Sequence, residues 1–242
     1  MTSSFTFNTI GTVHACYKEK FGVPRQPGLV KIESSIEILE PYNRDEAFRA
    51  LTDFSHIWIV FVFHQTQQQG WNPTVRPPRL GGNERVGVFA SRSMFRPNPV
   101  GLSVVELKKI RRQDGKLFLD IMGADLIDGT PVLDIKPYLP YADIIAHAVA
   151  GYANDKPAMQ LRVSFTPNAQ ALVETYRSQW PDLQQCIIEI LQLDPRPAYQ
   201  DAASNQKAEF AVRLYDLDVK WRVSGDWVEV YDLLVVDLSV KD

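Results

Sequence analysis

A series of short strand-forming segments separated by turn residues constrains this chain more than any other feature. The strongest, from His56 to His64, has the sequence HIWIVFVFH, and its β-branched and aromatic residues predict a strand buried on both faces. Turn signals at residues 113–115 and 128–130 separate later segments of the same kind. The other expected strands span residues 5–13, 35–39, 86–90, 101–110, 117–122 and 131–135. Their spacing predicts a barrel or sandwich within a mainly β protein.

Helical patterns are fewer and lie mostly in the last third of the chain. Asn43 and, three residues later, Glu46 form a capping-box pattern, which predicts a helix over residues 43–53. Near Tyr215 the apolar positions change from even to odd, which predicts a bulge or a turn between two strands. The remaining C-terminal elements are expected as a strand over residues 161–166, helices over 168–179 and 182–193, and further strands from residue 210 onward.

The composition of the chain changes after about residue 146, where the small residues of HAVAGYANDKPAMQ are typical of a connector. The 242 residues suffice for one large domain or two small ones. We therefore expect an N-terminal domain of residues 1–146 and a C-terminal domain of residues 147–242.

Composition excludes several classes of protein. The two cysteines, Cys16 and Cys186, lie 170 positions apart without a CxxC motif, so neither a disulfide framework nor a zinc knuckle is encoded, and a reducing, cytoplasmic compartment is expected. No stretch approaches 18 uncharged apolar residues, and the first 20 residues do not resemble a signal peptide, so we expect neither secretion nor a membrane span. The net charge of −3 argues against indiscriminate coating of nucleic acid.

Familiar catalytic motifs are absent from the sequence. It contains no GxGxxG, no GxxxxGK followed by Ser or Thr, no GxSxG and no HExxH, which disfavours a Rossmann or P-loop nucleotide site. Only four histidines occur, and His56 and His64 on one strand would lie about 26 Å apart. A metal site is therefore not expected.

Three loops rich in proline and glycine are the most unusual feature: residues 21–29 (FGVPRQPGL), 75–82 (VRPPRLGG) and 91–101 (SRSMFRPNPVG). Proline fixes φ and glycine permits positive φ, so such loops direct their arginines and glutamine rigidly, as a binding site requires. Residues 76–96 hold five arginines and a single acid, which suits an anionic partner such as RNA. Alternatively, the loops are plain turns whose arginines face solvent. Nearby aromatic residues that could stack on unpaired bases or belong to the core are Phe21, Trp71, Phe89 and Phe95.

These loops also carry a family resemblance. The segments FGVPRQPGLV, WIVFVFHQT, VRPPRLGG, RVGVFASRSMFRPNPVGLSVVEL and DLIDGTPVLDIKPYLPYAD, spread over about residues 7–143, and DPRPAY at 194–199 closely resemble the TsaA-like family. The resemblance implies a β-barrel methyltransferase without a Rossmann sheet, with a smaller C-terminal α+β domain, acting as a homodimer. It further implies S-adenosylmethionine as cofactor, no metal, and N6-methylation of N6-threonylcarbamoyladenosine at position 37, directly 3′ of the anticodon, in threonine tRNA.

The resemblance also assigns binding residues. Arg25 or Arg92 would pair with the methionyl carboxylate of the cofactor. An arginine should meet the carboxylate of the threonylcarbamoyl group, with Arg76, Arg79 and Arg96 as candidates, and Arg196 would join them in binding RNA. The expected cofactor-binding residues are Pro24, Arg25, Gln26, His64, Gln65, Arg92, Leu102, Asp125, Leu126, Ile127 and Asp128.

The catalytic residues are harder to assign. An acceptor for the N6–H bond would help methyl transfer, and other adenine-N6 methyltransferases supply one from an Asp or Asn followed by two prolines and an aromatic residue. Residues 96–99 (RPNP) and 194–199 (DPRPAY) contain similar residue types in a different order. From residue type and rigidity alone, Asn98 or Asp194 would accept a hydrogen bond from N6–H, and Tyr199 would stack on or border the base. Alternatively, Asp194 is a helix cap or an ion-pair partner of Arg196.

Two other functions remain open at this point. A non-catalytic RNA-binding barrel would use the basic loops and the aromatic residues but would leave residues 24–26 and 125–128 without a role. A methyltransferase acting on another RNA or on a small molecule would share the cofactor site. Cofactor binding separates the first alternative from the enzyme.

Overall fold

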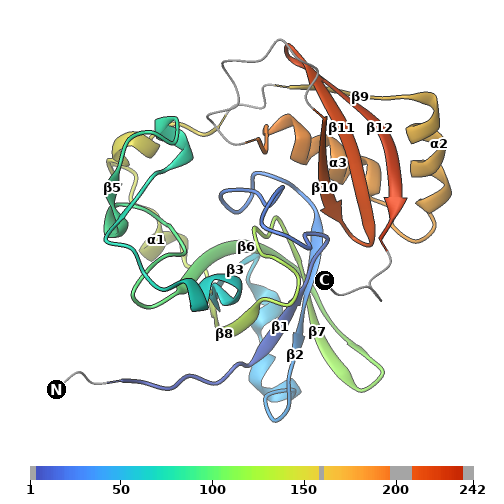
Figure 1. The fold of residues 1–242 in the computed structure, drawn as a ribbon. Coiled ribbons are helices and arrows are strands. Elements are labelled where there is room, and N and C mark those ends of the chain that lie inside the picture. The colour runs from blue at the N-terminus through green and yellow to red at the C-terminus, as the bar shows by residue number, and fades with distance from the viewer. Residues whose placement is uncertain (1–3, 158–160, 197–208, 237–242) are drawn as a thin grey trace.

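The computed structural model describes residues 4–157, 161–196 and 209–236 (Figure 1). Six strands, all antiparallel to their neighbours, form a closed barrel in the order β1-β2-β7-β6-β3-β8. Side chains alternate along each strand, so every second residue points into the barrel and is removed from water. The strands are β1 (Gly11–His14), β2 (Glu33–Ile38), β3 (His56–Val62), β6 (Val100–Gln113), β7 (Lys116–Met122) and β8 (Pro131–Pro137). Fully buried residues from five of them are Val13, Ile36, Ile57, Ile59, Leu119, Ile121 and Val132.

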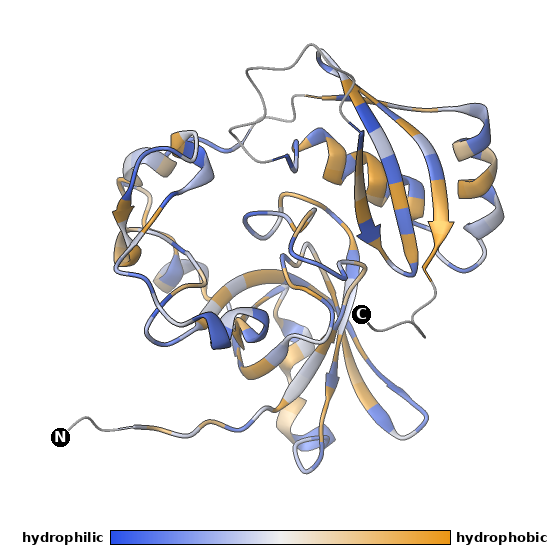
Figure 2. Cartoon of the chain, in the orientation of Figure 1, coloured by the Kyte–Doolittle hydropathy of each residue, from blue (hydrophilic) through white to orange (hydrophobic). Residues whose placement is uncertain are grey.

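A second sheet has the strand order β10-β11-β12-β9, with β9 parallel to β12 and the other pairs antiparallel. Its strands are β9 (Arg162–Phe165), β10 (Glu209–Leu214), β11 (Leu217–Ser224) and β12 (Trp227–Val235). Figure 2 shows hydrophobic and hydrophilic residues alternating along β11. Helix α2 (Pro167–Tyr176) packs against β12 and β9, and α3 (Leu183–Gln192) packs against β9. Thr166 caps α2 by accepting the Ala169 N–H.

Shorter elements lie between strands of the barrel along the chain or follow its last strand, β8. The strands β4 (Thr74–Val75) and β5 (Val86–Gly87) pair as a small ribbon that extends away from the barrel (Figure 1). We call residues 71–98, which include this ribbon, the basic arm. The remaining helices are α1 (Pro140–Asp143) and the 3-10 helices η1 (Asp45–Phe48), η2 (Leu51–Asp53), η3 (His64–Gln69), η4 (Pro78–Leu80), η5 (Val88–Ala90) and η6 (Gly151–Ala153).

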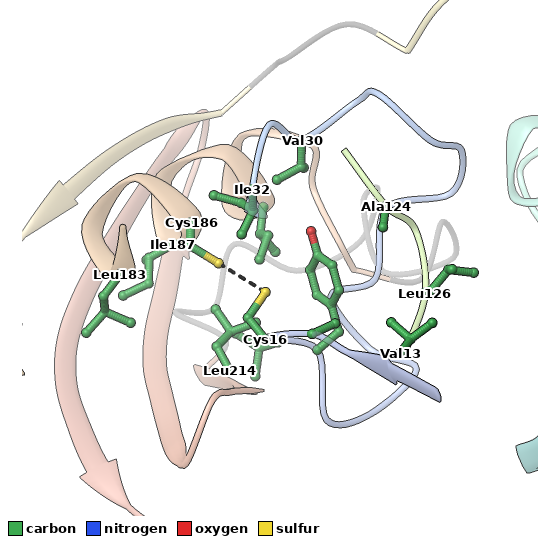
Figure 3. Packing of buried hydrophobic residues seen from close by; sticks show 14 of the residues in the cluster. Val13, Cys16, Val30, Ile32, Ala124, Leu126, Leu183, Cys186, Ile187 and Leu214 are labelled. Atoms are coloured by element: carbon green, nitrogen blue, oxygen red, sulfur yellow. Dashed lines mark hydrogen bonds between the residues drawn. The ribbon is translucent and has the colours of Figure 1, made fainter. Parts of the chain in front are cut away.

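The barrel and the second sheet share one continuous hydrophobic core. Helix α3 buries Cys186 and Ile187 against the end of β1, where the Sγ atoms of Cys16 and Cys186 lie 3.5 Å apart as free thiols (Figure 3). Nearby, Tyr17 pairs with Leu214 of β10, and the Tyr215 N–H donates to the Cys16 carbonyl at 2.7 Å. The two sheets are therefore fixed relative to each other by packing and backbone hydrogen bonds.

The mainly β prediction, the turn at Tyr215 and both C-terminal helices are confirmed. Three strand predictions need correction. The first strand begins only at Gly11, because the preceding residues lie outside the barrel with Phe5 and Phe7 exposed. Strand β3 is fully buried on one face only, since just its barrel-facing residues are covered, and it ends at Val62, so His64 lies outside it in η3. Residues 88–90 form a 3-10 turn instead of continuing a strand.

The helix expected over residues 43–53 is also wrong. Two 3-10 helices, η1 and η2, occupy this segment and are separated by Ala50 at a positive φ of 65°. Asn43 does not cap them, because its amide donates to the Gly115 carbonyl and its side-chain oxygen accepts from Arg112. A contact distant in sequence therefore replaces the local cap. The domain boundary near residue 146 stays a prediction.

Candidate active site

A cleft of about 1490 Å³ opens between the basic arm, the end of the barrel and residue 195 of the C-terminal region. All three proline- and glycine-rich loops contribute to its lining, together with residues 125–127 after β7 and residues 150–153 of the connector. We call it the central cleft. Segments separated by more than 100 residues in sequence thus meet around one space that is large enough for a cofactor and part of a second ligand.

The first loop is fixed at both ends. Gly22 is buried with a φ of +87°, and a Cβ atom there would lie 2.5 Å from Val212 in β10, so only glycine fits this approach to the second sheet. At the other end, the Gly28 N–H donates to the Gly123 carbonyl at 2.8 Å, next to β7. The loop therefore presents Pro24 and its two following residues to the cleft from a rigid backbone.

Two of the loops meet through side chains. Arg92 donates from Nη1 to Oε1 of Gln26, and the Gln26 amide donates to the Arg25 carbonyl at 2.6 Å. These residues were assigned to one cofactor site although 66 positions separate Arg92 from Gln26 in the chain. The hydrogen bonds hold the Arg92 guanidinium in the lining of the cleft, where it could bind a carboxylate of a ligand.

Asp125 supplies the negative charge of the site. The Ser103 hydroxyl donates to Oδ1 of Asp125 at 2.6 Å. Burial raises the pKa of this carboxyl to about 6, although the Ser103 hydrogen bond and the positive charge of Arg92 act in the opposite direction. Near neutral pH the group is therefore mostly ionised and lies close to its titration range, which favours a cationic ligand beside it.

His64 and Leu102 complete the expected cofactor residues at the barrel end. His64 lines the cleft at the start of η3, and burial lowers its pKa, so the neutral imidazole predominates at neutral pH. Leu102 points outward from β6 and is 52% exposed. Ten of the eleven expected cofactor residues line the cleft, and Asp128 does not. Its carboxylate instead accepts from the Ala15 N–H at 2.9 Å and from Lys18 at 2.8 Å.

The lining of the central cleft is strongly basic. Among the described residues that line it, Asp125 is the sole acid, whereas the cations are Lys20, Arg25, Arg76, Arg79, Arg85, Arg92 and Arg96. Within the described ranges, the side chains of Arg76 and Arg79 form no hydrogen bond or ion pair. Arg96 is committed to the protein, since it donates to the Ser91 carbonyl at 2.7 Å and to the Val88 carbonyl at 3.3 Å. An anionic ligand is therefore favoured in the cleft.

The residues considered for catalysis are less clearly grouped. Asn98 is exposed and is not part of the cleft lining. Both carboxylate oxygens of Asp194 accept from the Arg196 guanidinium at 2.7 Å, so the ion pair considered as an alternative is confirmed. Pro195 between them lines the cleft, whereas Arg196 does not. Tyr199 lies outside the described residues.

Sequence reasoning missed Ser103 and Tyr152. Ser103 is a polar residue at a barrel-facing position of β6, between Gly101 and Val105, and that break in the apolar alternation was the available signal. Tyr152 lies in the connector, and its hydroxyl donates to the Ala90 carbonyl of the basic arm at 2.9 Å. Nothing in the connector sequence signals that contact.

In the described part of the chain, no three His, Cys, Asp or Glu side chains gather as a metal site. No helix there has the length and apolarity needed to cross a membrane.

Comparisons with known proteins identify the family. The family model of the tRNA-methyltransferase O N-terminal domain matches residues 12–144, and that of the TrmO C-terminal domain matches residues 158–236. A tRNA (adenine(37)-N6)-methyltransferase of Escherichia coli (strain K12) is 51% identical over 96% of this chain and 98% of its own length. A Pseudomonas aeruginosa protein named putative S-adenosylmethionine-dependent methyltransferase RcsF is 43% identical over 93% of this chain and 95% of its own. A crystal structure of TrmO from Pseudomonas aeruginosa has a TM-score of 0.77 at 35% identity, over 96% of this chain and 100% of that one. The chain belongs to the tRNA-methyltransferase O (TrmO) family.

Proposed function

We propose that this protein transfers the methyl group of S-adenosylmethionine to N6 of adenosine 37 in tRNA. We further propose that this adenosine carries the N6-threonylcarbamoyl group, that the tRNA is threonine tRNA, and that the product is m6t6A. The observation that carries the proposal is the central cleft, whose lining combines ten of the residues expected to bind the cofactor with a surplus of cations. The cytoplasmic location expected from the cysteine content stays a prediction.

The residues of the cleft fit S-adenosylmethionine. Arg92, oriented by Gln26, suits the methionyl carboxylate, and the partly buried Asp125 carboxylate suits the adjacent ammonium or the sulfonium. Backbone groups of residues 125–127 and the barrel end at His64 are available for the adenine. Bound there, the cofactor supplies a methyl group already activated by the positive charge on sulfur. The protein then accelerates the reaction mainly by positioning the two reactants. We propose, as the family resemblance implies, that this site works without a Rossmann sheet and without a metal.

The acceptor RNA would enter past the basic arm. Arg76 and Arg79 are the arginines most suited to phosphate and to the threonylcarbamoyl carboxylate, because Arg96 already donates to two backbone carbonyls. Plain adenosine lacks the carboxylate, so these cations would have no anionic partner when it binds. The enzyme would therefore discriminate against plain adenosine.

Asp194 and Asn98 remain our candidates for accepting a hydrogen bond from N6–H of the substrate adenosine, with Tyr199 beside the base. Asp194 would have to share an oxygen between Arg196 and the substrate, for which a carboxylate has lone pairs to spare. Single-turnover methylation by Asp194→Asn and by Asn98→Ala tests this assignment. Wild-type rates in both variants would exclude these two residues.

We also propose that the protein acts as a homodimer. Leu102 on the outside of β6 adjoins a hollow of about 390 Å³ that is also lined by Trp58 and Asp143. Directly after Asp143 the chain exposes Ile144 and Ile145, at 59% and 63%. Apolar surface of this kind is typical of a subunit interface. Light scattering on Ile145→Glu tests it, and an unchanged mass of two chains, or a wild-type monomer, would refute this interface.

Methyl transfer itself is tested with purified protein, S-adenosylmethionine and threonine tRNA prepared with and without the threonylcarbamoyl group. We expect mass spectrometry of the nucleosides to find one added methyl on the modified adenosine alone. Calorimetry should give one cofactor per chain for the wild type and a clear loss of affinity for Arg92→Ala. If the wild type binds tRNA but not the cofactor, the protein is an RNA-binding barrel and the proposal is wrong.

A further inference from the structure

The aromatic residues near the basic loops differ in their surroundings. Phe21 and Phe95 are half-buried, and Trp71 is exposed but is not part of the central cleft lining. Phe89, in η5, both lines the cleft and is 75% exposed. Exposing a phenyl ring of this size to water is unfavourable, so a ring that is exposed inside a binding cleft suggests contact with a ligand.

The backbone around Phe89 is held from several sides. Arg96 donates to the carbonyls on either side of this turn, at Val88 and Ser91, and the Ser91 hydroxyl donates back to Val88 at 2.8 Å. From the connector, the Tyr152 hydroxyl donates to the carbonyl of the next residue, Ala90. The ring is therefore presented by a fixed turn, and little conformational entropy would be lost when a ligand contacts it.

Arg96 also contacts the ring itself. Its guanidinium carbon lies 5.8 Å from the centroid of the Phe89 ring, within the range of a cation–π interaction. The guanidinium thus joins the ring to the turn that carries it. This arrangement gives Arg96 a role within the protein, in place of the direct RNA contact expected from sequence.

We propose that Phe89 is a stacking surface for an unpaired nucleobase of the substrate RNA loop, and that Arg96 is the positioning residue that holds it. The occupant is a nucleobase because the cleft that Phe89 lines has seven cations and a single acid among its described lining residues, which match a ligand that brings phosphates together with flat aromatic groups. The inference rests on the proposed function for the identity of the RNA. It adds a contact that selects for single-stranded RNA at this site.

Binding of a fluorescently labelled anticodon stem-loop RNA tests the stacking. Because one base–aromatic stack is removed, Phe89→Ala should bind about 5- to 150-fold more weakly than the wild type. The slope of log affinity against log salt should stay unchanged, since no phosphate contact is removed. Phe89→Tyr keeps the aromatic face and should bind like the wild type. The matched control is Phe7→Ala, which removes a phenyl ring of similar exposure (69%) outside the cleft and should have no effect.

Arg96 is tested through its coupling to Phe89. Arg96→Lys should weaken RNA binding, yet the double variant should be no weaker than Phe89→Ala alone, because both changes remove the same stack. Cofactor affinity by calorimetry should be unchanged in Phe89→Ala, which separates a loss of stacking from misfolding. Additive losses, or a reduced salt slope in Arg96→Lys, would mean that Arg96 contacts RNA directly and would refute its positioning role.

The outcomes separate this inference from the proposed function. RNA binding by Phe89→Ala within twofold of the wild type overturns the stacking surface even if the wild type methylates tRNA. Phe89-dependent RNA binding by a wild-type protein that methylates no tRNA supports the stacking surface and overturns the proposed function.

Discussion

The stability of this protein should depend on pH through Asp125. Its pKa is about 6 in the folded protein and about 4 in an unfolded chain, so the folded state binds more protons between these values. The free energy of unfolding therefore falls as pH rises from about 4 through 6. A shift of about two pKa units corresponds to about 3 kcal/mol, present below pH 4 and lost above pH 6.

The variant Asp125→Asn removes this titration and keeps the size of the side chain, and the amide can still accept the hydrogen bond from Ser103. As pH rises from 4 to 7, the free energy of unfolding of the variant should therefore increase by about 3 kcal/mol relative to that of the wild type. Urea unfolding of both proteins at several pH values measures the difference, in which the titration of all other groups cancels. Asp114→Asn, in an exposed turn at the β6–β7 hairpin, controls for replacing a carboxylate that is not buried. Parallel profiles for the wild type and Asp125→Asn would refute the burial argument.

The same group links pH to cofactor affinity. If the ionised carboxylate faces the cationic part of S-adenosylmethionine, protonation must weaken binding, and affinity at pH 5 should be about tenfold lower than at pH 7.5. Asp125→Asn should bind weakly at both pH values, without this dependence. A wild-type affinity that does not change between them would mean that Asp125 does not contact the cofactor.

Three shorter predictions follow from the geometry. Gly101→Ala would bring a Cβ atom within 2.2 Å of the Phe61 ring, so it should destabilise the barrel by about 1–3 kcal/mol and lower Tm. Gly22→Ala combines a positive φ with a clash against β10, and should cost about 2 kcal/mol or more while also weakening cofactor binding, which thermal unfolding and calorimetry measure. The double variant Arg76→Ala and Arg79→Ala should reduce the salt slope of RNA binding by about 0.7 for each phosphate that is no longer bound, and an unchanged slope would contradict a phosphate role.

The sequence predicted those parts of the fold that depend on local alternation. Strands β2, β6, β7 and β8 and helices α2 and α3 were found because a period of 2 or 3.6 is set by backbone geometry alone. The segment at residues 43–53 was misread because its capping-box pattern competes with Arg112, a partner almost 70 positions away. Local patterns contain no information about such partners.

The sequence predicted the loops that line the central cleft, but it did not predict how their residues contact one another. The three rigid loops were recognised from proline and glycine, and they meet at one cleft. The hydrogen bonds within the cleft depend on tertiary contacts, such as those of Arg92 with the Gln26 side chain and of Tyr152 with the Ala90 carbonyl. From the sequence, three arginines were therefore equivalent candidates for binding the substrate carboxylate. The structure distinguishes Arg96, which donates to backbone carbonyls, from Arg76 and Arg79.

The two carboxylates of the 125–128 turn illustrate how one short motif divides structural and functional work. Asp128 binds Lys18 and the Ala15 N–H, and thereby ties the turn to the segment that follows β1. Asp125 accepts from Ser103 and makes no ion pair with any described residue, so its charge is left for a ligand. A partly buried carboxylate kept ionised without an ion pair opposes folding. The family resemblance assigns both residues to the cofactor, whereas in our proposal only Asp125 contacts the ligand, because Asp128 is already bound to Lys18 and the Ala15 N–H.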